Sequence, residues 1–421
     1  MMNTILLLML QATLGASPVS ETGTSFEQLT QIAIAQNKTL QAAREQLRQA
    51  EARLTQAGLR PNPSLDFSRS TDTLLGGEGD SGFAVTFSQP IEIGGKRTKR
   101  IRRAEAELEV MKAEIADAER RLTGQLKEAY LQAIDISARL SFLDRTRQLN
   151  RQTVEVMNVR LAAGDASRLD SHLLQAENNR VEAQRLQAES RLIAAMLEIR
   201  RLAGIAPDAS LSLRPLAPAA LAVRDEVGLV EIALSSRPDL QAARLREALA
   251  EAGVDLARSQ AVPNLTGSVR YAREPVVSRL ASATQRRAFD RENVLDFGIS
   301  IPLPLWNREQ GNIREASSKV IQAKAERDAL ENSIRAEVAT ASRRYQSASR
   351  TLDLIRTGVV NETQAGFTIT QLAYRLGDMR LLDVLVQQRS LVDAQIAELT
   401  AEAEAAAAEA ELELAVGGRL N

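Results

Sequence analysis

The sequence contains no cysteine and a single histidine, His172, among its 421 residues. The absence of cysteine excludes disulfides, iron–sulfur clusters and thiolate metal sites. One imidazole argues against a zinc or copper centre within a single chain, and we interpret His172 as a surface or packing residue. The seven methionines form no cluster, and no catalytic triad or carboxylate pair is evident. We therefore expect no resident metal, no cofactor and no enzymatic activity.

Aromatic residues and long apolar runs are also scarce. One tryptophan, four tyrosines and eight phenylalanines make up 3% of the chain, whereas alanine, leucine, glutamate, glutamine and arginine dominate, a composition typical of long helices. The 53 basic and 54 acidic residues balance, so no nucleic-acid partner is expected. No segment reaches the about 18 apolar residues of a transmembrane helix, so any membrane crossing would have to use β-strands.

Residues 1–17 have the pattern of a secretory signal peptide. A short apolar run from Ile5 to Leu10 is followed by small residues, although no lysine or arginine precedes the run. We expect this segment to direct export.

Two parts of the sequence resemble each other. The stretch NKTLQAAREQL from Asn37 matches RPDLQAARLREAL from Arg237, and Pro63 and Pro263 occupy equivalent places before an alternating segment. This repeat predicts an internal duplication. In the first repeat (18–202) we expect a helix at 25–59, strands at 64–70 and 82–89, a long helix at 96–163 and a helix at 167–202. After a linker at 203–224, the second repeat (225–416) should have a helix at 225–259, strands at 264–271 and 294–301, a long helix at 308–376 and a helix at 379–413, before a tail at 417–421.

The four expected strands alternate between apolar and polar residues, which predicts a sheet with one apolar and one polar face. The apolar face would be the core of a small sandwich in a globular protein, or would face lipid in a membrane protein. Periodicity alone leaves both interpretations open. The residues expected on this face are Leu65, Phe67, Phe83, Val85, Phe87, Leu265, Val269, Tyr271, Leu295, Phe297 and Ile299.

The long helices carry apolar residues at every seventh position. One such column runs unbroken from Ile101 to Leu143, and a second, from Ile313 to Ile355, is interrupted at Arg327. Sustained heptads predict supercoiled packing against other helices. Each long helix would extend roughly 100 Å, and the two shorter helices of each repeat together match one long helix in length. The body is therefore expected to be a rod or tube, and four strands per chain would close a membrane barrel only if several chains combine.

After the signal segment, the chain resembles the TolC family of bacterial outer-membrane efflux channels. The resemblance rests on the duplication, on PNPSL from Pro61, on the paired Gly-Asp turns, and on two strand-to-helix transitions, FSQPIEIGGKR from Phe87 and IPLPLWNREQGNI from Ile301. The two transitions are most similar to the heavy-metal, CzcC-type branch, the outer-membrane components of tripartite RND efflux systems.

This resemblance implies an α+β membrane protein. Family members are homotrimers whose 12-stranded β-barrel, with four strands from each chain, is continuous with a long α-helical coiled-coil tunnel in the periplasm. The linker and the tail would form a belt around the tunnel. The transition from barrel to tunnel would fall at a set of residues that permit a bend: Pro90, Gly94, Gly95, Pro302 and Pro304.

The resemblance also implies partners: outer-membrane lipid, a periplasmic membrane-fusion adaptor and an inner-membrane RND pump. The adaptor would dock on the helical tip at Gly164, Asp165, Gly377 and Asp378. A periplasmic gate would be built from Asp170, Tyr374, Asp383 and Arg380. In this gate Tyr374 would bond to Asp170, and Asp383 would form an acidic ring. Alternatively, Asp170 and Asp383 simply start the returning helices, where a carboxylate favours the positive end of the dipole.

A basic cluster follows the first transition and consists of Lys96, Arg97, Lys99, Arg100, Arg102 and Arg103. It is interpreted either as a solvated helix start or as a contact for lipid phosphates. The leading functional hypothesis is an outer-membrane channel that passively conducts divalent heavy-metal cations from a periplasmic pump assembly. The alternatives are a multidrug-efflux or type I secretion channel and, from a different class, a soluble periplasmic coiled-coil scaffold or adaptor.

Overall fold

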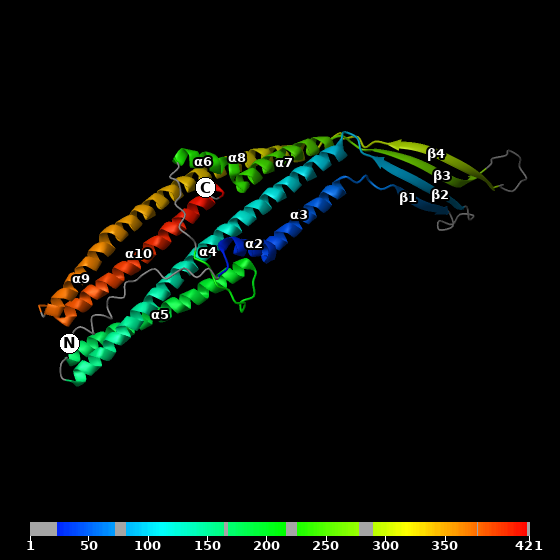
Figure 1. The fold of residues 1–421 in the computed structure, drawn as a ribbon. Helices are drawn as coiled ribbons and strands as arrows, with labels where there is room; N and C mark the ends of the chain where they lie inside the picture. Colours follow the sequence, from blue (N-terminus) through cyan, green and yellow to red (C-terminus); the bar gives the residue numbers. More distant parts are fainter. Residues whose placement is uncertain are drawn as a thin grey trace, which may run out of the picture. The chain divides into compact units, whose positions relative to one another are not determined.

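The computed structural model describes residues 23–71, 81–163, 167–215, 225–277, 289–376 and 378–418 (Figure 1). The expected signal peptide and the tip residues Gly164, Asp165 and Gly377 lie outside these residues. The chain divides into two compact units. The strand unit comprises residues 45–114 and 239–330, and the helical unit comprises the remainder.

The strand unit holds a four-stranded antiparallel sheet in the order β1-β2-β3-β4. The strands are β1 (Ser64–Thr71), β2 (Ser81–Ile91), β3 (Leu265–Val277) and β4 (Phe289–Ser300), side by side in chain order in Figure 1. They are longer than the alternating segments predict, because β3 and β4 continue to pair where the alternation has faded, with Glu274 opposite Glu292.

Pro90 lies within β2, opposite Thr266, and not in a bend after the strand as the sequence predicts. The sheet tolerates a proline here for a geometric reason. β1 begins at Ser64, opposite Ser88, so at Pro90 β2 has a neighbour on one side only and resembles an edge strand, where a missing N–H is accepted.

The register places the predicted apolar residues on one face. Directly opposed residues of an antiparallel sheet point to the same side. One row across the sheet is Leu65, Phe87, Val269 and Phe297, and the next is Phe67, Val85, Tyr271 and Leu295. Between them, on the other face, lies the row of Asp66, Thr86, Arg270 and Asp296. The predicted alternation is confirmed by these rows.

The rest of the described chain consists of helices and the irregular segments that join them. The helices are α2 (Phe26–Gln36), α3 (Lys38–Ala57), α4 (Lys96–Ala162), α5 (Arg168–Ala203), α6 (Glu226–Ser236), α7 (Pro238–Gln260), α8 (Gln310–Leu354), the π-helical segment η2 (Ile355–Val360), α9 (Asn361–Leu376) and α10 (Leu381–Val416). None of these helices has the combination of length and apolar character needed to cross a membrane.

The helices predicted at 25–59 and 225–259 are each broken in two, which corrects the prediction of single helices. The first break falls at Asn37, whose backbone is extended (φ −60°, ψ 121°), and the second at Arg237 (φ −69°, ψ 122°). Each of these two joint residues uses its side chain to hold a helix end that is distant in the chain. The Asn37 amide donates to the carbonyl of Leu202 at 2.9 Å, and the Arg237 guanidinium donates to the carbonyl of Ala415 at 3.0 Å.

The long helix predicted at 308–376 is also not uniform. It passes through η2, where the backbone widens to π-helical bonding before α9 begins. The sequence of η2, IRTGVV, contains one glycine and four β-branched residues, all weaker helix formers than alanine or leucine. Arg356 in η2 pairs with Glu398 at 3.0 Å and with Glu402, both on α10.

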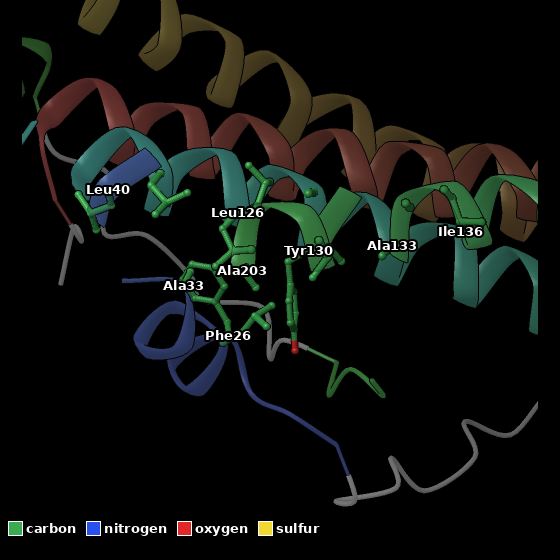
Figure 2. Close-up of a cluster of buried hydrophobic side chains, with 14 residues drawn as sticks. Phe26, Ala33, Leu40, Leu126, Tyr130, Ala133, Ile136 and Ala203 are labelled. Atoms are coloured by element: carbon green, nitrogen blue, oxygen red, sulfur yellow. The ribbon is translucent and has the colours of Figure 1, made fainter. Parts of the chain in front are cut away.

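The largest core of the helical unit surrounds Tyr130 of α4, which is fully buried. Its ring meets that of Phe26 edge to face at 5.7 Å, and Figure 2 shows the two side by side. The hydroxyl donates to the carbonyl of Arg214 and lies 3.2 Å from that of Thr24; burial raises the pKa of Tyr130. Since Thr24 also pairs with Leu213 in a parallel bridge, the described part of the predicted linker is fastened to α2 and α4.

Candidate functional site

The apolar face of the sheet is exposed to solvent in the single chain. Phe67, Phe297 and Ile299 expose 75%, 76% and 79% of their surface. The other residues predicted on this face are exposed as well, except Val85 and Leu265, which are half-buried. A globular sandwich would cover such a face with a second layer, and nothing among the described residues of the strand unit does so. An uncovered apolar face of this kind is typical of a surface that contacts a membrane or another protein.

The opposite face is polar and carries an ion-pair network. Arg270 contacts Asp296 at 3.1 Å and Glu274 at 2.6 Å, while Ala84 and Ala272 are buried beside it. These two faces, one apolar and one charged, match those of a sheet with lipid on one side and water on the other.

At the first strand-to-helix junction, Gly94 and Gly95 both have positive φ (74° and 70°), a conformation that favours glycine. A Cβ on Gly94 would also lie 3.0 Å from the Cβ of Val262. At the second junction, Pro302 and Pro304 lie in an irregular segment after β4, and Glu309 adopts a positive φ of 59° before α8. Each junction therefore turns through a left-handed residue.

The basic cluster is partly used inside the chain. Arg97 donates to the carbonyl of Gly58 at 2.6 Å. Arg100 donates to those of Ala57 and Leu59 at 3.1 and 3.0 Å, and Lys96 bonds to Asn264. The two arginines thereby donate to carbonyls at the C-terminal end of α3, where no further helical turn supplies N–H groups for these carbonyls. Sequence reasoning missed this role, because the carbonyls lie about 40 residues earlier in the chain.

Arg100 also holds Glu92, the residue after β2, in a bidentate ion pair. Its hydrogen bond holds the pKa of Glu92 below the usual glutamate value of 4.5. Arg100 thus joins the end of β2, through its ion pair with Glu92, to the end of α3, through its bonds to the carbonyls, at the point where α4 begins.

A cavity of about 490 Å³ with both polar and apolar lining residues lies within the helical unit, between α4, α5 and α10. Asp135, Arg139 and Gln184 each bury a polar atom that has no partner among the described residues, and burial raises the pKa of Asp135. Polar atoms around a space of this size are satisfied by water. The apolar column on α4 reaches the cavity through Ile136 and Leu143, but it gave no signal for Asp135, Arg139 and Gln184, which lie outside that column.

The predicted gate residues lie at the ends of α5, α9 and α10. The Asp383 carboxylate accepts the N–H of Arg380 at 3.0 Å, so it starts α10 as the local interpretation predicts. Asp170 lies in the first turn of α5. Tyr374 packs against the cluster of Phe367, Val384 and Leu391. The described residues contain no hydrogen bond between Tyr374 and Asp170, so that link stays a prediction.

Asp378 is exposed between α9 and α10, and His172 is exposed on α5. Within the described ranges, no group of three or more histidine or acidic side chains is arranged to hold a metal ion.

The sequence matches the family model described as "Outer membrane efflux protein" over residues 29–205 and 229–418. Among curated proteins, the cobalt-zinc-cadmium resistance protein CzcC of Cupriavidus metallidurans is 26% identical over 386 residues, covering 89% of this chain and 85% of that protein. The pyoverdine export outer membrane protein OpmQ of Pseudomonas putida is also 26% identical, covering 93% of this chain and 85% of its own.

Solved structures share the fold. The outer-membrane channel OprN aligns with a TM-score of 0.76 at 20% identity, covering 94% of this chain and 90% of that one. CusC, whose structures are described in terms of transmembrane channel formation, aligns with a TM-score of 0.75 at 19% identity, covering 94% and 92%.

Proposed function

The chain belongs to the outer membrane efflux protein family, and from this premise we propose that it is the channel through which a tripartite pump exports divalent heavy-metal cations. As a family member it is an outer-membrane efflux channel and a passive conduit, not an enzyme. The observation that carries the choice of cargo is the similarity to a cobalt-zinc-cadmium resistance protein over most of both chains. The metal is cargo, and its selection is left to the pump and adaptor, consistent with a chain without cysteine and with one histidine.

We propose a homotrimer in which three sheets close a 12-stranded barrel. β1 and β4 are both sheet edges, and closure with neighbouring copies would pair their unused backbone groups. Exposed leucine and isoleucine side chains on α5, namely Leu186, Ile193 and Leu197, support contact between copies along the helices. The similar joints at Asn37 and Arg237 support the proposed duplication.

At the periplasmic end, the turns carrying Gly164 and Asp165 and carrying Gly377 and Asp378 would receive the adaptor, which connects the channel to the inner-membrane RND pump. Three-fold symmetry would bring three copies of Asp383 toward one axis. Carboxylates that converge on a pore attract cations. Asp383 can serve both purposes, since its backbone contact within the chain uses one carboxylate oxygen.

The gate is tested by conductance in planar bilayers. Replacing Tyr374→Phe together with Asp170→Ala should raise the open probability, because it removes the proposed link that holds the periplasmic end closed. Asp383→Ala should weaken cation selectivity and block by trivalent cations. Asp383→Asn is the matched control, since its side-chain oxygen still accepts the Arg380 N–H while the charge is lost. Selectivity retained in both Asp383 variants would show that this residue only starts α10.

The cargo is tested with a deletion strain. Loss of this gene should sensitise cells to cobalt, zinc and cadmium salts, and a plasmid copy should restore growth, while sensitivity to a panel of drugs stays unchanged. Sensitisation to drugs alone would contradict the metal proposal and favour a multidrug channel. Loss of a secreted siderophore or protein would favour the export role that the name of OpmQ describes for that relative.

A further inference from the structure

The segment between β4 and α8, residues 301–309, displays apolar side chains to an unusual degree. Leu303 exposes 73% of its surface, Leu305 60% and Trp306 86%. Trp306 is the chain's only tryptophan. A large aromatic side chain that contacts so little of its own chain contributes almost nothing to folding by burial. Its position therefore calls for a binding partner outside the chain.

Local hydrogen bonds hold this segment in shape. The Gln310 side chain donates to the carbonyl of Trp306 at 3.0 Å and accepts the N–H of Arg308 at 2.7 Å. Asn307 accepts the N–H of Glu309 at 3.0 Å. Together with Pro302 and Pro304, which restrict the backbone, these bonds fix the loop before any partner binds. A pre-ordered loop loses little entropy on binding.

The exposed apolar surface is continuous with that of the sheet. On β4, Phe297 and Ile299 belong to the exposed face, and Ile301, at 49% exposure, carries it into the segment. The exposed apolar surface ends at Trp306, because the next four residues are polar or charged: Asn307, Arg308, Glu309 and Gln310. Arg308 folds back so that its Nε donates to the carbonyl of Pro304 at 3.3 Å, which places a guanidinium beside the apolar loop.

We propose that residues 301–308 form an interfacial anchor in which Trp306 enters the phospholipid headgroup layer on the helical side of the sheet. Tryptophan is enriched at this depth because its ring is apolar while its N–H needs a polar partner. Arg308 lies next to it, where a cation meets lipid phosphate. The anchor sets how deep the strands lie, so that the row containing Phe87 and Phe297 stays in hydrocarbon. This anchor proposal rests on the proposed membrane function, and it adds Trp306 as a residue that contacts lipid.

A single tryptophan allows a direct test in the unaltered protein. The channel is reconstituted into phosphatidylcholine vesicles, with the lipid tails brominated either near the headgroup or near the chain end. If the anchor is correct, the emission of Trp306 lies at a shorter wavelength than in the urea-unfolded chain and is protected from quenching by acrylamide. Bromine near the headgroup should quench this emission more strongly than bromine near the chain end.

A second reporter separates failure of the anchor from failure of the membrane proposal. In Trp306→Phe combined with Phe297→Trp, the only tryptophan lies in an apolar row of β4, and its emission should be quenched more by the deep bromines. If this reporter is quenched and native Trp306 is not, the sheet is in the membrane and the anchor is wrong. Blue-shifted emission from Trp306 without quenching by either lipid would assign the segment to a neighbouring copy of the chain. If acrylamide readily quenches the emission of Trp306, the segment lies in water. If neither reporter is quenched, the membrane proposal itself fails.

Discussion

The proposed trimer is expected to insert poorly into the outer membrane when its chains carry Phe87→Arg. Phe87 is 46% exposed in the row formed with Leu65, Val269 and Phe297, and it lies near the middle of the 11-residue β2, a length that just spans a bilayer when tilted. An arginine on the lipid face near mid-bilayer costs about 2–4 kcal/mol, and a trimer would carry three. The measurement is the heat-resistant trimer band in outer-membrane fractions.

Two controls separate charge on the lipid face from general damage to the strand. Phe87→Leu keeps an apolar side chain at the same position and should leave the trimer intact. Ser88→Arg places the same charge on the adjacent residue of β2, which faces the polar side of the sheet, in the row with Ser64 and Ser268. It should be tolerated better than Phe87→Arg. Equal loss of trimer in the two arginine variants would mean that the apolar face does not contact lipid.

The sheet could be predicted from sequence because its signal is local and has a period of two. Leu65 and Phe67, or Phe297 and Ile299, alternate with polar residues, and a register shift by one residue would reverse every side chain. The ends of the strands could not be predicted in this way. Beyond Tyr271 the side chains no longer alternate, and pairing continues through backbone bonds, as between Arg273 and Asn293.

The helix joints show where local information ends. At Asn37 the side-chain oxygen caps α3 locally by accepting the N–H of Leu40, whereas the bond from its amide to Leu202, 165 residues away, could not be predicted from the local sequence. At Arg237 a local signal existed. Pro238 follows it, and a proline disfavours a helical conformation in the residue before it and favours the first position of a new helix. The gate stays a prediction from the resemblance, because the described residues contain no bond between Tyr374 and Asp170 and the proposed ring of Asp383 needs three copies of the chain.

Replacing Arg237→Met should destabilise the helical unit more than the corresponding change at the other joint, Asn37. Arg237 is only 5% exposed. Its guanidinium donates to the carbonyl of Ala415, while the neighbouring Ser236 hydroxyl donates to that of Val416 at 3.0 Å. These carbonyls end α10 and have no further turn to bond. Because a hydrogen bond from a charged group contributes about 1.5–3 kcal/mol, and methionine preserves the side-chain bulk, we expect a loss of about 2–3 kcal/mol. The measurement is the urea midpoint of helical circular dichroism in detergent-solubilised trimers.

Two further substitutions determine whether the helix-end contact or the ion pair provides this stability. Glu337 pairs with Arg237 at 2.7 Å but is 47% exposed, so Glu337→Gln should cost less than about 1 kcal/mol. Asn37→Ala removes the bonds to the Leu202 carbonyl and to the Leu40 N–H, and should cost about 0.5–2 kcal/mol, as the loss of a helix cap does. The expected order of destabilisation is therefore Arg237→Met, then Asn37→Ala, then Glu337→Gln. If Glu337→Gln is as damaging as Arg237→Met, the ion pair holds the joint and the carbonyl contact at the end of α10 is incidental.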